Sequence, residues 1–182
     1  MRRFFAAFLF LLILGLSGCQ PIPSSHTTAA GTPTLAWQVA FSPRGGATEL
    51  VVKTLSQAQK TIFVQAYSFT SAPIAQALVD AKKRGVQVDV ILDKSQRTEH
   101  YSEADFIAHA GIPVSIDAAH AIAHNKVMVI DGEVVITGSF NFTKAAEEHN
   151  AENLLVIQDK VLAQKYEENW KQHKSHSQPF AK

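Results

Sequence analysis

The sequence predicts an α/β fold, an α-β-α sandwich in which helices cover both faces of a mixed, largely parallel sheet. Segments rich in β-branched and aromatic residues alternate along the chain with segments whose apolar residues recur at helical spacing. The chain has 182 residues and is 46% hydrophobic, which suits one domain built around one core. We therefore expect a single folded domain per chain.

The domain begins with an apolar strand over residues 36–41, which ends at a stretch of Ser, Pro, Arg and Gly over residues 42–46. A helix over residues 47–60 follows, because its apolar residues recur close to helical spacing. The β-branched and aromatic residues of segment 61–67 then predict a strand.

The next helix is expected over residues 71–84, with Ser71 as its N-cap and Gly85 just past its end. Alternating valines predict a strand over residues 86–92. The polar segment 93–100 then has the composition of a loop.

Beyond residue 100, apart from segment 124–141, the sequence predicts short elements and one long C-terminal helix. A helix over residues 103–110 precedes a short strand over 113–116, and a helix over 144–149 precedes a strand over 154–157. An amphipathic helix over residues 159–173 closes the domain. The two tryptophans lie within apolar patterns, so both are expected in the core.

The N-terminal residues predict export. Residues 1–18 have two arginines, a short apolar stretch and small residues at the end, which is the layout of a signal peptide. Cys19 is the only cysteine and follows Leu-Ser-Gly, an arrangement that resembles the lipobox of bacterial lipoproteins. This resemblance implies cleavage before Cys19 and lipidation there, hence a membrane-anchored lipoprotein that faces the periplasm. The alternatives are an ordinary signal peptide or an uncleaved anchor.

Three further segments follow from composition. Residues 19–34 are rich in Pro, Ser, Thr and Ala and are expected to form a flexible tether. The folded domain is expected over residues 35–173, and residues 174–182 as a polar, frayed tail. The formal net charge is only +1, so a site for a polyanion has to be a local patch.

A hairpin is predicted in the segment HNKVMVIDGEVVITGSFN, residues 124–141. Two apolar runs flank the pair Asp131-Gly132, which favours a two-residue hairpin turn. With these two residues as the loop, Ile130 pairs with Glu133. The two strands then fold the end of the segment back onto its beginning.

The same register brings polar groups together. It places Lys126 opposite Thr137 and His124 opposite Ser139, with Asn141 close by. His124 and Lys126 are two residues apart, so an extended chain points both side chains to one face. An imidazole, an ammonium, a hydroxyl and a carboxamide thus converge, and this set of donors suits a phosphate.

The segment matches the signature H-x-K-x₄-D-x₆-G-S-x-N, and in this it resembles the phospholipase D superfamily. The six fixed positions are His124, Lys126, Asp131, Gly138, Ser139 and Asn141. Six fixed positions occur by chance on the order of once in 10⁸ starts. In size and element order the folded part is similar to the small bacterial endonuclease branch. The resemblance implies a phospholipase D-like sandwich that hydrolyses phosphodiester bonds without a metal or another cofactor.

The resemblance also implies the roles of the polar residues. His124 would attack phosphorus and form a phosphohistidine, while Lys126 and Asn141 would hold the non-bridging oxygens. Glu152 would accept a hydrogen bond from the other ring nitrogen of His124. Ser139 has two open roles, as a donor to the intermediate or as the cap of the following helix.

Asp131 and Gly138 are expected to be structural. The predicted hairpin places Asp131 at the turn, far from His124, and Gly138 allows a close approach to the backbone. The leaving oxygen needs a general acid, which the family takes from a second copy of the motif. This chain has one copy, so we expect a homodimer with the active site on its two-fold axis and His124 supplied by each subunit.

Three functions remain open at this point. The first is an endonuclease acting on DNA or RNA, the second a phospholipase D acting on membrane phospholipids, and the third a catalytically silent lipoprotein that binds nucleic acid. His120 and His124 are four residues apart, a spacing that binds metal on a helix. Because this region has the pattern of a loop followed by a strand, no metal site is predicted.

Overall fold

The computed structural model describes residues 36–180. The predicted signal peptide, Cys19 and the whole predicted tether, residues 19–34, lie outside the described residues. In chain order, the elements are β1 (Ala36–Ser42), α1 (Ala47–Ser56), β2 (Thr61–Ala66), α2 (Ala72–Lys83), β3 (Gln87–Asp93), the 3₁₀-helix η1 (Lys94–Arg97), α3 (Ala104–His109), β4 (Val114–Asp117), β5 (Lys126–Ile130), β6 (Val134–Gly138), α4 (Lys144–Glu148), β7 (Glu152–Gln158), α5 (Lys160–His176) and β8 (Gln178–Pro179). Across residues 36–180, none of these helices has the length and apolar character needed to span a bilayer.

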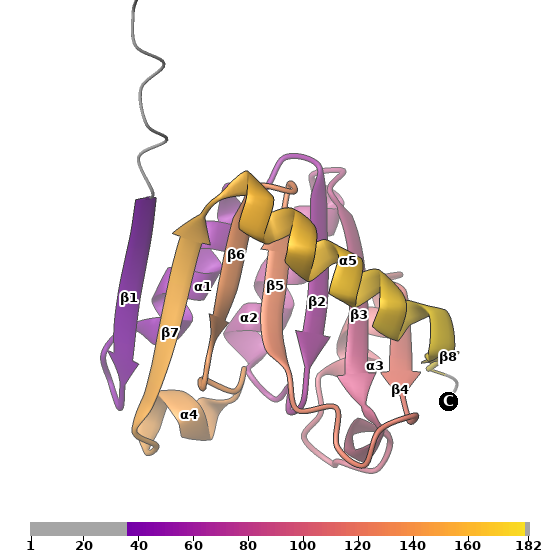
Figure 1. The fold of residues 1–182 in the computed structure, drawn as a ribbon. Helices are drawn as coiled ribbons and strands as arrows, with labels where there is room; N and C mark the ends of the chain where they lie inside the picture. Colours follow the sequence, from indigo (N-terminus) through magenta and orange to yellow (C-terminus); the bar gives the residue numbers. More distant parts are fainter. Residues whose placement is uncertain (1–35, 181–182) are drawn as a thin grey trace, which may run out of the picture. The chain divides into compact units, whose positions relative to one another are not determined.

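The eight strands form one sheet in the order β1-β7-β6-β5-β2-β3-β4-β8. Helices α1, α2 and α3 lie behind this sheet and α5 crosses its front, so the predicted sandwich is confirmed (Figure 1). The sheet is mixed, as predicted, but the expectation that it is largely parallel is wrong. Among the strands of residues 36–180, only β2–β3 and β3–β4 are parallel, and a crossover that contains a helix joins each of these pairs. The other neighbouring pairs are antiparallel.

Two apolar clusters hold the layers together. The larger fills the space between the sheet and helices α1 and α2, and includes Ile62, Val64 and Leu78. The smaller lies under α5 and is built on Val127 and Val129. Neighbouring residues of a strand point to opposite faces, so β2 and β5 each contribute to both clusters.

The two tryptophans differ in burial. Trp170 on α5 is buried, stacks on Phe63 with ring centroids 4.7 Å apart and donates its indole N–H to the carbonyl oxygen of Val64 at 2.9 Å. Its predicted place in the core is confirmed. The same prediction for Trp37 is wrong, because β1 is the edge strand of the sheet and leaves Trp37 60% exposed.

The hairpin forms, but its register differs from the prediction by one residue. Ile130 pairs with Val134, so the turn contains Glu133 as well as Asp131 and Gly132. Glu133 donates to the carbonyl oxygen of Ile130 at 3.0 Å, while its own carbonyl accepts from Asp159 at 2.9 Å. Because the carbonyl oxygen of Glu133 accepts this hydrogen bond from the start of α5, Glu133 does not form the predicted strand pair with Ile130.

The C-terminal segment is ordered, contrary to the prediction of a frayed tail from residue 174. Helix α5 continues to His176, and β8 pairs antiparallel with β4. Lys174 donates to Asp89 at 2.7 Å and to Ser115 at 2.9 Å. The backbone N–H of Phe180 donates to the carbonyl oxygen of Val114 at 2.9 Å. The prediction of a frayed tail depended on the lack of an apolar pattern in this segment. The segment is ordered by these polar contacts with the edge of the sheet instead.

Candidate active site

His124 and Lys126 lie where the chain enters β5, beside the end of β2. Lys126 pairs with Ala66, and the backbone N–H of Tyr67 donates to the carbonyl oxygen of Asn125 at 2.8 Å. The Tyr67 ring lies 4.7 Å from the His124 ring, centroid to centroid, and its centroid is 5.1 Å from the Lys126 ammonium. Tyr67 was missed by the sequence analysis, because its contact with both residues depends on the pairing of β2 with β5.

The ammonium of Lys126 is held in a buried position. Lys126 is 8% exposed, and its Nζ donates to the carbonyl oxygen of His124 at 3.2 Å. Burial lowers the pKa of Lys126, and the negative charge of Glu152 partly offsets this effect. Burial of the Lys126 ammonium costs desolvation free energy, which one hydrogen bond to a neutral carbonyl offsets only in part. An anion bound here would offset more of this cost.

Ser139 and Gly138, at the end of β6, are fixed against Asn153 of β7. The Ser139 hydroxyl accepts from the backbone N–H of Asn153 at 3.0 Å and from its side-chain amide at 3.2 Å. These two bonds use the acceptor capacity of the hydroxyl, and across residues 36–180 nothing accepts its proton. The alternative in which Ser139 caps the next helix is wrong, because Thr143 caps α4 by accepting from Ala146 at 3.1 Å.

Gly138 allows β6 to lie tightly against β7. Its φ is +142°, and a Cβ added there would lie 2.3 Å from the carbonyl oxygen of Asn153. No side chain fits this space. The same carbonyl accepts from the backbone N–H groups of Ser139 and Phe140, each at 3.1 Å. Gly138 thereby sets the position of the residues that follow it.

The side chain of Asn141 is incompletely paired. Its Oδ1 is buried and has no hydrogen-bond partner among the described residues. Buried polar atoms nearly always have a partner in the functional state, so this oxygen is available to accept a hydrogen bond from a ligand. Asn141 also lines an open groove of about 660 Å³, together with Tyr67, Thr143 and Lys144.

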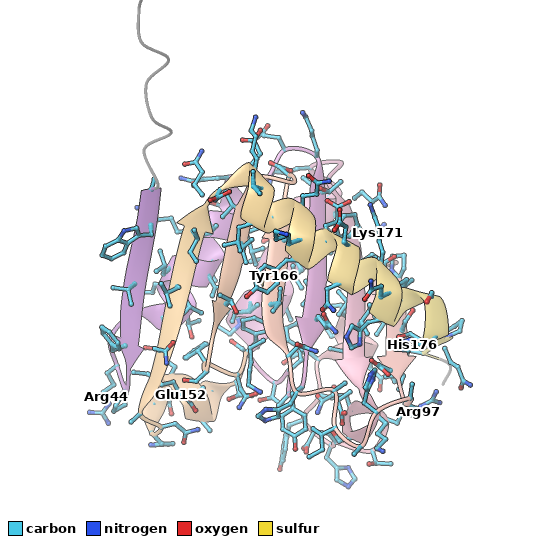
Figure 2. The ribbon with its side chains drawn as sticks, in the orientation of Figure 1. Arg44, Arg97, Glu152, Tyr166, Lys171 and His176 are labelled. Carbon is cyan, nitrogen blue, oxygen red and sulfur yellow. The ribbon has the colours of Figure 1, made fainter. Side chains whose placement is uncertain are left out.

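Glu152 begins β7 at the same end of the sheet (Figures 1 and 2). Its carboxylate accepts from the side-chain amide of Asn150 at 3.2 Å. Among the contacts described for this single chain, Glu152 acts on the site through its charge beside Lys126. The predicted hydrogen bond from His124 to Glu152 is not formed within residues 36–180 of one chain, and that role stays a prediction.

Asp131 lies at the far end of β5, away from His124. Its carboxylate accepts from the backbone N–H groups of Gln59, Lys60 and Thr61 at 2.7 to 2.9 Å. Burial opposes ionisation, but these hydrogen bonds outweigh it and hold the pKa of Asp131 below its usual value. The contact joins the hairpin turn to the start of β2.

The site therefore gathers one ionisable ring, one buried ammonium, one hydroxyl and one amide at one end of the sheet. They come from the start of β5, the end of β6 and the loop after it, with Glu152 at the start of β7. The family described as "Cardiolipin synthase, PLD-like domain" matches residues 51–174 of this chain.

The chain belongs to the phospholipase D superfamily.

Other members of the superfamily agree with this placement. The chain is 43% identical over 135 residues to a protein named phospholipase D from Rickettsia felis, covering 74% of this chain and 68% of that protein. It is 33% identical over 116 residues to the mitochondrial cardiolipin hydrolase of Xenopus tropicalis, covering 64% and 55%. The crystal structure of Nuc, a phospholipase D family member from Salmonella typhimurium, matches with a TM-score of 0.78 and 41% identity, covering 81% of this chain and 99% of Nuc. As a phospholipase D superfamily enzyme, the protein hydrolyses phosphodiester bonds.

Proposed function

We propose that this phosphodiesterase is an endonuclease that cleaves DNA or RNA without a metal, through a phosphohistidine formed on His124. The observation that carries the choice of substrate is the groove beside Asn141. Apart from Ala145, every residue that lines it has a polar group in its side chain. The composition of the groove therefore supports a polar polymer.

Two aromatic rings in the groove support the same choice. Tyr67 and Tyr101 both line it, and Tyr101 is 81% exposed. Exposed aromatic rings provide stacking surfaces for unpaired bases, worth about 1–3 kcal/mol for each base. The chain also matches 99% of the length of Nuc, so the two proteins share one compact fold.

The reaction proceeds in two balanced steps. In the first, a ring nitrogen of His124 attacks phosphorus, the P–N bond forms and the P–O bond to the leaving group breaks as an acid protonates that oxygen. In the second, water attacks phosphorus and gives its proton to a base, and the P–N bond breaks. Lys126 stabilises the non-bridging oxygens, and the free hydroxyl proton of Ser139 points to the same role. The side-chain NH₂ group of Asn141 donates to these oxygens in this proposal, whereas its Oδ1 can only accept.

The general acid comes from a second subunit in this proposal. Each chain has one His-x-Lys motif, so a two-fold dimer places a His124 from each subunit at one phosphate. One imidazole acts as the nucleophile and the other as the acid, and Glu152 orients the nucleophilic ring. We also propose export and anchoring in a membrane through Cys19, with the enzyme facing the periplasm.

A second candidate is a phospholipase D that acts on membrane lipids. It is favoured by the relatives named phospholipase D and cardiolipin hydrolase. The motif residues around His124 suit the phosphodiester that both substrates share, so the choice between the two substrates depends on the neighbouring groove. A lipid substrate requires an apolar surface beside His124, in addition to the polar groove.

The test uses the full chain, purified in detergent and assayed in EDTA with supercoiled plasmid and phosphatidylglycerol vesicles in parallel. His124→Ala is the inactive variant, and His109→Ala, which alters an exposed histidine on α3, is its matched control. We expect plasmid nicking by the wild type and by His109→Ala, and none by His124→Ala. Release of the lipid headgroup with intact plasmid would replace the endonuclease with the phospholipase. Nucleic-acid binding without cleavage of either substrate would favour the silent binding protein.

The dimer is tested by mixing subunits. Mixed dimers of wild type and His124→Ala contain one imidazole in the shared site. Co-purified mixed dimers should therefore lose nearly all activity, whereas half-activity would mean that each subunit has a complete site of its own.

A further inference from the structure

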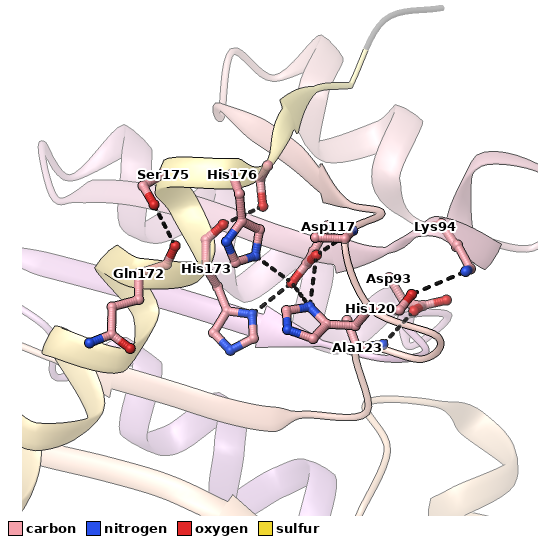
Figure 3. Close-up of polar contacts among 11 residues, drawn as sticks. Asp93, Lys94, Asp117, His120, Ala123, Gln172, His173, Ser175 and His176 are labelled. Carbon is pink, nitrogen blue, oxygen red and sulfur yellow. Dashed lines mark hydrogen bonds and ion pairs between the residues drawn. The ribbon is translucent and has the colours of Figure 1, made fainter.

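Four potential metal ligands meet beside the end of β4, in a cluster that the proposed reaction does not use. We call Asp117, His120, His173 and His176 the Asp-His cluster (Figure 3). Asp117 ends β4, His120 lies in the following loop, and His173 and His176 lie in the last turns of α5. Each offers one ligand atom, and these atoms all lie within 4.8 Å of one another.

The three imidazoles converge on a single oxygen. Oδ2 of Asp117 is 2.6 Å from Nδ1 of His173, 3.1 Å from Nδ1 of His120 and 3.3 Å from Nε2 of His176. The ring centroids lie only 4.9 to 5.3 Å apart. The Nδ1 atom of His120 also lies 3.1 Å from Oδ1, so three imidazoles and the backbone N–H of Ala119 crowd around one carboxylate. A single cation shared by the four ligand atoms would replace the protons between these atoms.

The Asp117 carboxylate, at the centre of the cluster, is buried and held in place by a backbone hydrogen bond. Asp117 is fully buried, and its Oδ1 accepts from the backbone N–H of Ala119 at 3.0 Å. Outer hydrogen bonds of this kind orient ligands in metal sites. The histidines remain partly accessible to an entering ion.

The ligand set indicates which ion fits. Three imidazole nitrogens and one carboxylate oxygen suit a transition metal such as Zn²⁺ rather than Ca²⁺ or Mg²⁺, which prefer oxygen ligands. Tetrahedral Zn²⁺ with bonds of about 2.0–2.1 Å separates its ligand atoms by about 3.3 Å. The ring nitrogens of His120 and His176 already lie near this distance from Asp117 Oδ2, at 3.1 and 3.3 Å, whereas that of His173 is closer, at 2.6 Å. Small side-chain rotations of the histidines would complete the geometry.

We propose that the Asp-His cluster binds one Zn²⁺ ion as a structural site. Four ligands from the protein complete a tetrahedron, which is typical of structural rather than catalytic zinc. The ion would join the end of α5 to β4 and to the loop that leads to His124. The other end of this loop is already held, because Asp93 accepts from the backbone N–H of Ala123 at 2.7 Å. Lys94 also donates to the carbonyl oxygen of His120 at 3.1 Å.

This site escaped the sequence analysis because its ligands are distant in the chain. Asp117 and His173 are 56 residues apart. The sequence offered His120 with His124 as a helical pair, whereas the fold places His120 with residues of another strand and another helix. The zinc proposal replaces the prediction that the chain has no metal site. The zinc proposal does not depend on which substrate the enzyme cleaves.

The test measures zinc directly in the full chain, purified in detergent without a histidine tag. Metal is removed with chelator, Zn²⁺ is added back, and the unbound ion is removed before elemental analysis. We expect one zinc per chain in the wild type and in His109→Ala, and almost none in the double variant His120→Ala/His176→Ala. Zn²⁺ should also raise the Tm of the wild type by about 5 °C or more, and leave that of the double variant unchanged.

Cobalt provides a readout that does not depend on any variant. Co²⁺ bound in a tetrahedral site gives intense visible absorption, so adding it to the wild-type chain should produce these bands, and Zn²⁺ should abolish them. Absence of both the bands and bound zinc in the folded wild type would overturn the proposal. So would a double variant that folds and keeps as much zinc as His109→Ala.

Discussion

The ammonium of Lys126 donates to the backbone carbonyl oxygen of His124 at 3.2 Å. This bond connects the charged group of one motif residue to the main chain of the other. The Tyr67 ring contacts both side chains, so the pair is fixed from two directions. The imidazole and the ammonium are therefore positioned before any substrate arrives.

Replacement of Lys126 should reduce catalysis much more than stability. Lys126→Met keeps the length of the side chain and removes the charge that faces the phosphate, so we expect kcat to fall by about 10²–10³-fold. The measurement is cleavage of the substrate identified in the plasmid and vesicle assays. Lys165→Met removes an exposed charge from α5 and should keep full activity. Equal activity of the two variants would remove Lys126 from the mechanism.

Glu152 should control the alkaline side of the pH profile. Burial lowers the pKa of Lys126 from the usual 10.5, and Glu152 raises it. The pH dependence of kcat/KM reports groups of the free enzyme, so activity should fall as the pH rises through the lowered pKa of Lys126. In Glu152→Gln the opposing effect is lost and the alkaline limb should move to lower pH. An unmoved limb would show that Glu152 does not influence Lys126.

Asp131 should stabilise the fold without taking part in catalysis. Asp131→Asn loses a charged acceptor of three backbone N–H bonds, so we expect a loss of about 1–3 kcal/mol in the free energy of unfolding at pH 7. The folded-state pKa of Asp131 is lowered, so its contribution is complete above the unfolded value of about 3.9 and is lost as the pH falls through the folded value.

Urea unfolding at pH 7 and at successively lower pH values below 4 tests this prediction. The difference between wild type and Asp131→Asn should shrink as the pH falls. Glu133→Gln lies in the same turn and loses only an exposed ion pair with Lys160, so it should change stability by less than about 1 kcal/mol. A difference that grows on acidification would contradict the assignment.

Gly138→Ala should damage both the fold and the site. The added Cβ meets the carbonyl oxygen of Asn153 and has to adopt an unfavourable φ, which together should cost at least about 1–3 kcal/mol and displace Ser139. Gly85→Ala is the matched control, because Gly85 also has a positive φ, of +92°, but nothing lies within 4 Å of its added Cβ. We expect the control to lose some stability and keep its activity. Chemical denaturation and the cleavage assay measure the two effects.

The sequence predicted local structure well and pairing less well. The helices and strands before the hairpin follow from apolar periodicity, which depends on residues close in the chain. The register of the hairpin was wrong by one residue because a distant group, the N–H of Asp159, takes the carbonyl of Glu133. The strand composition also could not show that β1 would be an edge strand and leave Trp37 exposed.

The candidate site shows the same division. The signature identified His124, Lys126, Ser139 and Asn141, and the fold places all of them at one end of the sheet. Tyr67 and Asn153 carry no such signature, and their contacts arise only when β2, β6 and β7 are assembled. The Asp-His cluster is a still clearer case, since three separate segments supply it.

The position of β1 has a consequence for how the domain is made. Ala36 begins β1 and pairs with Gln158, at the end of β7, and within residues 36–180 β1 has no other neighbour in the sheet. A chain leaving the ribosome therefore produces this strand long before its partner exists. Closing so long a loop is entropically unfavourable until the intervening strands have formed. The first of the described strands to be synthesised must therefore wait for nearly the whole domain, and a nascent chain that stops before β7 leaves β1 unpaired.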